Sequence, residues 1–155
     1  MNRKLLMFFM LFAFVAMEAC TKDDGTENAV KMSASIDGVQ WDASFLAPTT
    51  LRNHKFIITG TNLAGGAILL STSADTVGTY LLYMPLIYQF NGTYKVTTLS
   101  PTAKDIFEGL SGTLKLTKVD TVAKVVSGSY EFKGINSSLD SARVTKGIFM
   151  NVPYL

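Results

Sequence analysis

Several residue types are scarce in this sequence. Its 155 residues include one cysteine, one histidine and one tryptophan, with only four prolines. A single cysteine excludes an intramolecular disulfide, so a folded domain has to be stabilised by its hydrophobic core. A lone histidine without a second cysteine or histidine lacks the converging ligands of a zinc site. The net charge is +2, and no basic run indicates nucleic-acid binding.

The sequence has one long apolar run, near its N-terminus. Arg3 and Lys4 precede Leu5–Met17, which as a helix would span roughly 20 Å, short of the ~30 Å core of a bilayer. This layout is typical of an export signal rather than a transmembrane helix. Ala19 and Cys20 resemble the end of a bacterial lipobox, whose cysteine is lipidated after cleavage. The alternative is ordinary signal cleavage, with the cysteine there by chance.

The segment after Cys20 is short, polar and acidic. Lys22, Asp23 and Asp24 resemble the surface-export signal of Bacteroidetes-type lipoproteins, which directs them to the outer face of the outer membrane. We therefore predict a signal peptide over 1–19, a lipidated tether over 20–29 and a folded domain over 30–155. Several acyl chains on Cys20 would hold the protein to the membrane without a transmembrane helix. The alternative for the tether is a solvated linker with no sorting role.

From residue 29 onward, apolar and polar residues alternate, which is typical of half-buried β-strands. Strands are predicted at 30–36, 39–45, 55–59, 67–71, 79–83, 86–90, 93–98, 111–118, 125–134 and 142–152. Turns are predicted at Asp37-Gly38 and Asn91-Gly92, an interruption at Pro48, a helical turn within 101–109 and a bulge at Gly147. Eight to ten short strands predict an all-β domain, either an antiparallel β-sandwich or a small barrel.

Several short motifs occur in an order that carries a family resemblance. They are Ile36-Asp37-Gly38 with Trp41, followed by residues 58–60, 78–80, 111–117, 126–132 and 144–149. Their order resembles that of an uncharacterised family of Bacteroidetes lipoprotein domains and covers residues 30–152. The resemblance implies an all-β domain of unknown function, and it transfers no catalytic or binding residue.

Motifs for catalysis are missing from the sequence. The glycines within 60–66 are not followed by the Lys-Ser or Lys-Thr pair of a phosphate-binding loop. Gly109-Leu110-Ser111-Gly112 does not match the nucleophile elbow of hydrolases. We expect His54 to be solvated at the surface. The sequence therefore predicts a non-catalytic domain with no cofactor and no metal.

Aromatic residues are the candidates for a binding surface. Trp41, Tyr83 and Tyr88 belong to two predicted hairpins, and exposed rings stack on the faces of sugars. The alternative is that the rings fill the core of the domain while the tyrosine hydroxyls reach water.

Three tripeptides resemble the Asp-(Ser/Thr)-apolar O-glycosylation motif of exported Bacteroidetes proteins. They make Thr76, Thr121 and Ser141 candidate acceptors. The alternative is a local turn, in which the aspartate side chain accepts hydrogen bonds from the following backbone.

These patterns favour an outer-membrane lipoprotein, exposed at the cell surface, whose β-domain binds a glycan, a small ligand or a protein partner. One alternative is a structural or assembly component of the cell envelope. The other is a lipocalin-like carrier with an internal cavity. A large apolar cavity would favour the carrier, whereas a packed interior with exposed aromatic rings would favour the binding module.

Overall fold

The structure is a computed structural model that describes residues 29–96 and 101–155. Within these ranges the chain is all-β, as its alternating sequence predicts, with a short 3-10 turn at Ala103–Asp105. No helix in this part of the chain has the length and apolar character that a membrane span requires. The predicted signal peptide, Cys20 and the predicted export residues Lys22, Asp23 and Asp24 lie outside the described residues.

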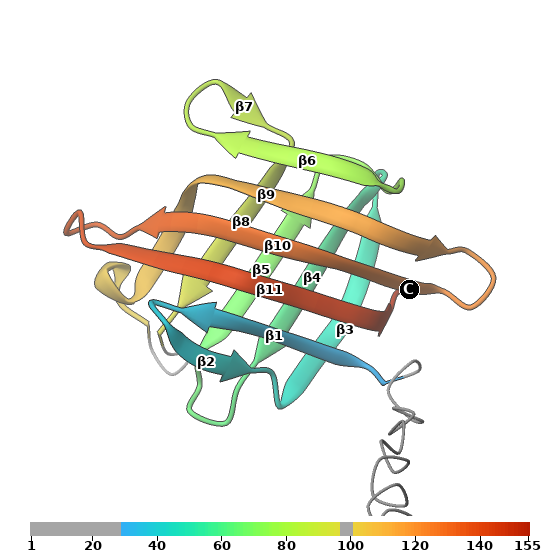
Figure 1. The fold of residues 1–155 in the computed structure, drawn as a ribbon, viewed down its shortest axis with the longest axis horizontal. Coiled ribbons are helices and arrows are strands. Elements are labelled where there is room, and N and C mark those ends of the chain that lie inside the picture. Colours follow the sequence, from blue (N-terminus) through green and yellow to red (C-terminus); the bar gives the residue numbers. More distant parts are fainter. Residues whose placement is uncertain (1–28, 97–100) are drawn as a thin grey trace, which may run out of the picture.

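The strands follow one another in antiparallel pairs (Figure 1). They are β1 (Lys31–Ile36), β2 (Val39–Asp42), β3 (Phe45–Arg52), β4 (Lys55–Thr61), β5 (Ala67–Thr72), β6 (Gly78–Tyr83), β7 (Ile87–Tyr88), β8 (Phe90–Lys95), β9 (Ile106–Asp120), β10 (Val125–Ile135) and β11 (Ser141–Pro153). The main sheet has the order β2-β1-β11-β10-β9-β8-β5-β4-β3, and the β6–β7 hairpin pairs with β9 beside this path.

The sheet curls into a half-barrel whose two halves form layers. In Figure 1, a front layer of β6, β9, β10, β11, β1 and β2 crosses a back layer of β8, β5, β4 and β3. An isolated bridge joins Thr49 of β3 to Tyr154, and the amide of Leu155 donates to the Thr49 carbonyl (3.0 Å). The predicted all-β antiparallel architecture is confirmed, and the half-barrel lies between the two forms considered, a sandwich and a closed barrel.

The core lies between the two layers and is built from alternate residues of each strand. In β10, Val126, Tyr130 and Phe132 point inward, as their spacing predicts. The fully buried apolar side chains come from both layers, and burial stabilises the fold by about 1.5–3 kcal/mol for each large one. They are Met32, Phe56, Ile58, Ile68, Leu70, Leu114, Leu116, Val126, Val144, Phe149 and Val152. These side chains occupy the space in which a carrier would hold its ligand.

Glycines opposite aromatic residues allow the front layer to curl. The cross-strand pairs are Gly112 with Phe132, Gly128 with Phe149, and Gly147 with Tyr130. A Cβ on Gly128 would overlap the Lys115 carbonyl and would lie 2.6 Å from the Phe149 ring. In each pair the aromatic ring lies over the glycine, in the space that a side chain there would fill. Such glycine–aromatic pairs allow a β-sheet to coil.

Strand β9 changes its partner part-way along its length. Its first residues, 106–108, pair with β8, whereas residues 111–116 pair with β6. Gly109 lies at the change, where a Cβ would lie 2.7 Å from the Gly92 carbonyl oxygen and from Leu82. The register with β10 also shifts here, between Lys133 and Gly134. This bend carries the β6–β7 hairpin away from the back layer.

Two local predictions are wrong, and a third is confirmed. Asn91-Gly92 lies inside β8 rather than in a turn, because the Phe132 ring occupies the place of a side chain at Gly92, 2.6 Å from a Cβ built there. The predicted interruption at Pro48 is part of β3, which absorbs it as a register shift between Ala47 and Thr50. The predicted helical turn within 101–109 is confirmed as the 3-10 turn at 103–105, after which β9 begins.

The bulge predicted at Gly147 is confirmed. Tyr130 lies opposite Gly147 and Phe132 lies opposite Val144, so two residues of β11 face Glu131 alone. Such bulges re-aim a side chain and increase the local twist.

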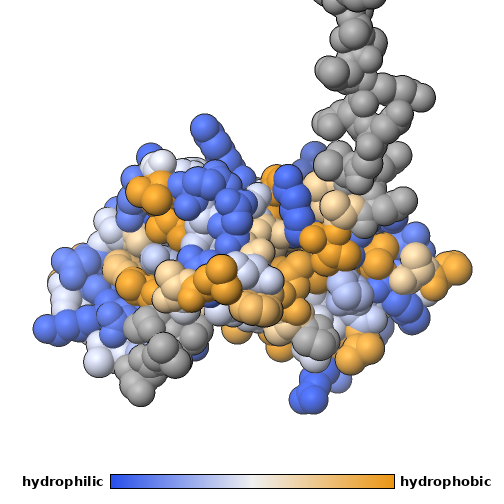
Figure 2. Space-filling view, turned by 90° about the horizontal axis from the view of Figure 1, so that it is seen from below, coloured by the Kyte–Doolittle hydropathy of each residue, from blue (hydrophilic) through white to orange (hydrophobic). Residues whose placement is uncertain are grey.

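One end of the domain exposes scattered apolar side chains. Seen from below (Figure 2), apolar patches lie among polar residues on this side of the molecule. Exposed apolar residues of the elements that reach it are Val39 in β2, Phe45 at the start of β3 and Leu63 between β4 and β5. We call these three residues the lower apolar end.

Candidate functional site

The segment 81–88, which we call the aromatic hairpin, concentrates exposed apolar side chains. In β6, Tyr80 and Leu82 point into the core, whereas Leu81 and Tyr83 point outward. The amide of Leu86 donates to the Tyr83 carbonyl (2.7 Å) and closes the turn. The exposed large apolar residues of the hairpin are Leu81, Tyr83, Met84, Leu86, Ile87 and Tyr88.

The two tyrosines of the hairpin face opposite sides. Tyr83 pairs with Ile87 and with Ser111, whereas Tyr88 pairs with the inward-facing Leu82. Directly paired residues of antiparallel strands share a face of the sheet. Tyr83 therefore lies on the outer face of the front layer, and Tyr88 lies on the side toward the back layer. Both rings are 57% exposed, but each belongs to a different surface.

Tyr88 borders a hollow of about 240 Å³ at the point where β9 leaves β8. Its other polar lining residues include Lys55, Ser71, Ser73, Asn91 and Glu108. A second hollow, of about 370 Å³, is lined by Ile106, Leu110, Ile135, Asn136 and Ser137. Met84, Glu108 and Gly109 border both hollows. The two open hollows therefore adjoin, and we call them together the hairpin groove.

The hairpin groove combines an aromatic ring with hydroxyl, amide and carboxylate groups. Ser71 lies opposite Asn91 on neighbouring strands, and Glu108 lies opposite Thr93. The exposed Glu108 side chain forms no ion pair with another described residue. Binding sites of this kind use apolar surface for contact area and a few polar groups for orientation. The groove thus has the components for a sugar ring, whose faces are apolar and whose edges carry hydroxyls.

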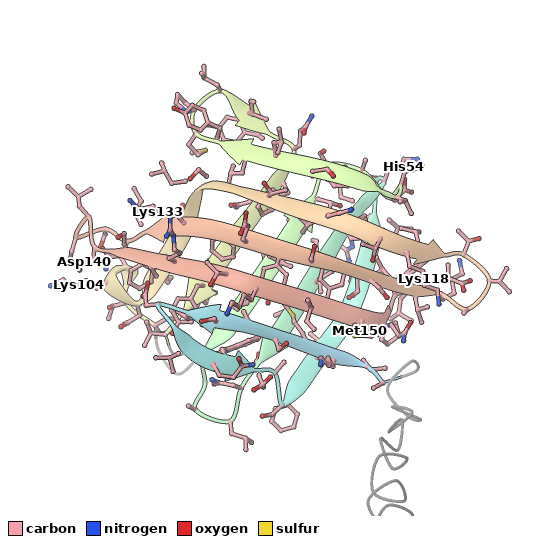
Figure 3. The ribbon with its side chains drawn as sticks, in the orientation of Figure 1. His54, Lys104, Lys118, Lys133, Asp140 and Met150 are labelled. Carbon is pink, nitrogen blue, oxygen red and sulfur yellow. The ribbon has the colours of Figure 1, made fainter. Side chains whose placement is uncertain are left out.

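The outer face of the front layer is hollowed and cationic. Two adjoining hollows, of about 360 and 240 Å³, both touch Glu131. Lys133 and Arg143 line the first hollow, and Lys115 and Lys146 line the second. Hydroxyl groups lie between these charges, on Thr79, Ser111, Thr113, Ser129 and Thr145. We call this surface the basic face; Lys133 marks it in Figure 3.

The basic face could not be predicted from the sequence, because its cations are far apart along the chain. Lys115 belongs to β9, Lys133 to β10, and Arg143 and Lys146 to β11. Alternation within each strand indicates which residues point outward. The cross-strand register, which places Lys133 opposite Arg143, decides which of them meet.

One comparison with known proteins identifies the chain. Residues 28–153 match the domain of unknown function DUF6252. The chain belongs to the DUF6252 family. The match confirms the part of the resemblance that concerns an uncharacterised domain, and the structure confirms that this domain is all-β. No curated protein and no solved structure matches the chain.

Trp41 lies in the core of the DUF6252 domain. Its side chain is 4% exposed, and its Nε1 has no hydrogen-bond partner among the described residues. A Cβ on Gly60 would lie 3.1 Å from the indole, so the ring packs closely over β4. A ring in this position stabilises the fold and is not presented to a ligand at the surface. Tyr83 and Tyr88 are the two aromatic candidates that the DUF6252 domain exposes.

His54 lies in the turn between β3 and β4. Asn53 and His54 have positive φ angles of 50° and 61°, as a two-residue hairpin loop requires. The His54 side chain is 84% exposed, and its Nδ1 lies 2.9 Å from Asp75 Oδ2. In the described parts of the DUF6252 domain, no three His, Cys, Asp or Glu side chains converge on a common point.

The three candidate glycosylation acceptors are exposed. Thr76 precedes β6, and its hydroxyl lies 3.2 Å from that of Tyr80. Thr121 lies in the turn after β9, and Ser141 is the first residue of β11. Their modification stays a prediction.

The turn that contains Thr121 has the local hydrogen bonds of an aspartate turn, which is the alternative to a glycosylation motif. Asp120 Oδ1 accepts hydrogen bonds from the amides of Ala123 (2.8 Å) and Val122 (3.0 Å). These bonds, led by the one from Ala123, hold the pKa of the Asp120 carboxyl below its ordinary value, with a further contribution from Lys118. Asp120 therefore has a structural role whether or not Thr121 is modified.

Proposed function

We propose that this DUF6252 protein is a surface-exposed outer-membrane lipoprotein whose β-domain binds a glycan in the hairpin groove without catalysing a reaction. The observation that carries the binding part is the position of Tyr88. Its half-exposed ring stands beside a hollow whose lining includes Ser71, Asn91 and Glu108.

Glycan binding in the hairpin groove would follow from this distribution of groups. The Tyr88 ring offers an apolar face to the C–H side of a sugar. The Asn91 amide and the Glu108 carboxylate lie where they could bond the sugar hydroxyls, and each such bond contributes about 1 kcal/mol. Because the groove is open and each contact is weak, affinity would come from several sugar units along its length.

The anchoring part of the proposal is supported by the sequence. The apolar run before Cys20 and the Lys22-Asp23-Asp24 segment after it favour a lipid anchor and export to the cell surface. Replacement of Cys20 by alanine is expected to release the protein from the membrane fraction. Attachment that survives Cys20→Ala would overturn the anchoring part and leave the binding part standing.

A glycan array probed with the full-length chain, purified in detergent, tests the binding part. We expect binding to at least one glycan and a loss of at least about tenfold in affinity for Tyr88→Ala. Phe45→Ala is the matched control, because Phe45 is also an exposed ring but lies in β3, away from the groove. Absence of binding to every glycan, or an equal loss in the control, would refute the proposal.

A second candidate function is a structural or assembly role in the cell envelope. The lower apolar end favours it, since exposed apolar residues beside the edge strand β2 fit a protein partner. Cross-linking in intact membranes tests this role. A specific partner that is lost with Val39→Ser and Leu63→Ser, but retained with Tyr88→Ala, would support it over glycan binding.

A further inference from the structure

We infer that the basic face is a second binding surface and that its ligand is an anionic polysaccharide, a sugar chain that carries carboxylate or sulfate groups. The surface lies on the outer side of the front layer, whereas the hairpin groove opens beside β8 and β9. The inference therefore stands independently of the proposed function.

The register of four neighbouring strands assembles the surface. Tyr83 of β6, Ser111 of β9, Lys133 of β10 and Arg143 of β11 are paired in turn, so they form one row across the front layer. Neighbouring strands lie about 4.8 Å apart, so the row extends over roughly 14 Å. An exposed ring at one end, a hydroxyl in the middle and two cations at the other end form a continuous strip.

A second row runs parallel to the first and adds another cation. Thr79, Lys115 and Ser129 are paired across β6, β9 and β10. Ser129 is four residues from Lys133 along β10, so the two rows lie roughly 13 Å apart. Lys146 and Glu131 lie between them. Charges spread over this area cannot all contact one small anion, but they can contact a chain that carries charge at intervals.

The positive charge of the basic face is not neutralised within the domain. Among the residues that line its two hollows, four are cationic and Glu131 is the one acid. None of these five side chains forms an ion pair with another described residue. Hollows lined by charge of one sign concentrate the field and attract ligands of opposite charge. The unsatisfied charge therefore points to a ligand that supplies anions.

Two features of this face oppose stability. Lys133 and Arg143 lie directly opposite each other, an arrangement in which like charges repel. Lys146 occupies the bulge with a positive φ of 51°, in the left-handed region that favours glycine. Strained backbone conformations and unfavourable charge pairs of this kind cluster at functional sites. Their coincidence around Glu131 supports a binding role for the face.

The hydroxyl groups and the Tyr83 ring favour a polysaccharide over other polyanions. A bilayer surface would meet the tips of the lysines and leave the recessed hydroxyls of Ser111, Thr113 and Ser129 without partners. Nucleic acid would be held by contacts to its phosphates, mainly from cations, with bases stacked on aromatic rings. A sugar chain uses all three kinds of group: hydroxyls for its own hydroxyls, cations for its acid groups and the ring for its apolar faces.

The test is titration of the full-length chain, purified in detergent, with polygalacturonate, chondroitin sulfate, neutral dextran and single-stranded DNA. At least one of the two anionic polysaccharides is expected to bind at least about tenfold more tightly than dextran, with an affinity that falls as salt is raised. The triple variant Lys133→Gln, Arg143→Gln, Lys146→Gln is expected to lose this binding by at least about tenfold.

A charge-matched control separates the surface from net charge. The variant Lys31→Gln, Arg52→Gln, Lys104→Gln removes three exposed cations that do not line the basic face. Its affinity is expected to change by less than about twofold. The inference is overturned if neither anionic polysaccharide binds, if dextran or DNA binds as tightly, or if the control loses as much affinity as the triple variant. Tyr88→Ala is expected to leave this binding intact, which distinguishes it from glycan binding in the hairpin groove.

Discussion

Both layers of the domain contribute buried apolar side chains to its core, but they present different outer faces. Across the back layer, Ala47, Thr59, Leu69 and Thr93 form a neutral row over four strands. The back layer also has cations, since Arg52 lies opposite Lys55 at one end of its strands and Lys95 lies in β8, whereas the front layer groups the four cations of the basic face around Glu131. Because the same alternation folds both layers, folding alone does not require cations on either outer face. The inner faces therefore reflect the fold, and the grouping of four cations on the front outer face is the feature on which the proposed anionic ligand rests.

Truncating one buried ring in each layer tests whether the layers are equivalent inside. Phe56 in the back layer and Phe149 in the front layer are both fully buried. We expect Phe56→Ala and Phe149→Ala each to lower the free energy of unfolding by about 3–5 kcal/mol, because each leaves a cavity. Urea denaturation measures both. The exposed Val39→Ala should change stability by less than about 0.5 kcal/mol, and a core variant that behaved like it would contradict this account of the core.

Adding one methyl group tests how the front layer curls. We expect Gly128→Ala to cost about 1–3 kcal/mol, because the new Cβ would overlap the Lys115 carbonyl and the Phe149 ring. Gly78→Ala is the control in the same layer, since its nearest contact would be 3.8 Å away. Thermal unfolding compares the two variants. Equal stabilities would show that curling does not depend on the glycine–aromatic pairs.

Raising the pH is expected to weaken the front layer through Tyr130. Burial raises the pKa of Tyr130 well above its ordinary value, so the folded protein keeps this proton after the unfolded chain has lost it. The contribution of Tyr130 is therefore fully present below about pH 10 and declines above it, by up to about 1.4 kcal/mol per pH unit.

Tyr130→Phe isolates this contribution. The variant should be less stable near neutral pH by about 1 kcal/mol, because the hydrogen bond from the Tyr130 hydroxyl to the Ser33 carbonyl (3.2 Å) is lost. Above pH 10 its stability should fall less steeply than that of the wild type. Tyr83→Phe, at an exposed position, serves as the control. If the stability of Tyr130→Phe falls with pH as steeply as that of the wild type, the prediction is contradicted.

The smallest expected effect is a gain in stability at the basic face. Lys146→Gly should raise the free energy of unfolding by up to about 1 kcal/mol, because glycine adopts the left-handed conformation without strain. The same variant should bind anionic polysaccharide less well. Chemical denaturation and titration measure the two properties, and Lys133→Gln, at an unstrained position, is the control. A loss of stability in Lys146→Gly would contradict the strain argument.

The strands with regular alternation could be predicted from the sequence. Residues 125–134 alternate without interruption, and β10 covers Val125–Ile135. The errors occurred where distant contacts override local preference. Asn91-Gly92 is a typical turn dipeptide, yet it continues a strand because Phe132, forty residues later, packs over Gly92. Local sequence does not encode that contact.

The candidate surfaces were predictable only in part. Tyr83 and Tyr88 could be identified as aromatic candidates, but their exposure, and the burial of Trp41, depend on which side of each strand faces the core. The basic face depends on register and on the bulge at Lys146, which set the neighbours of each cation across three strands. Strand register is a property of the folded sheet rather than of any one segment.

The pairing of β1 with β11 has a consequence for the timing of folding. Lys31 lies opposite Met150, so the first strand finds its partner only when a segment more than a hundred residues later is available. Sheets built on such distant pairings fold in milliseconds to seconds rather than microseconds. For the export proposed above this delay would be useful, because a chain that has not yet closed its sheet can still be threaded through a narrow channel. Closure of the half-barrel would then take place on the far side of the membrane.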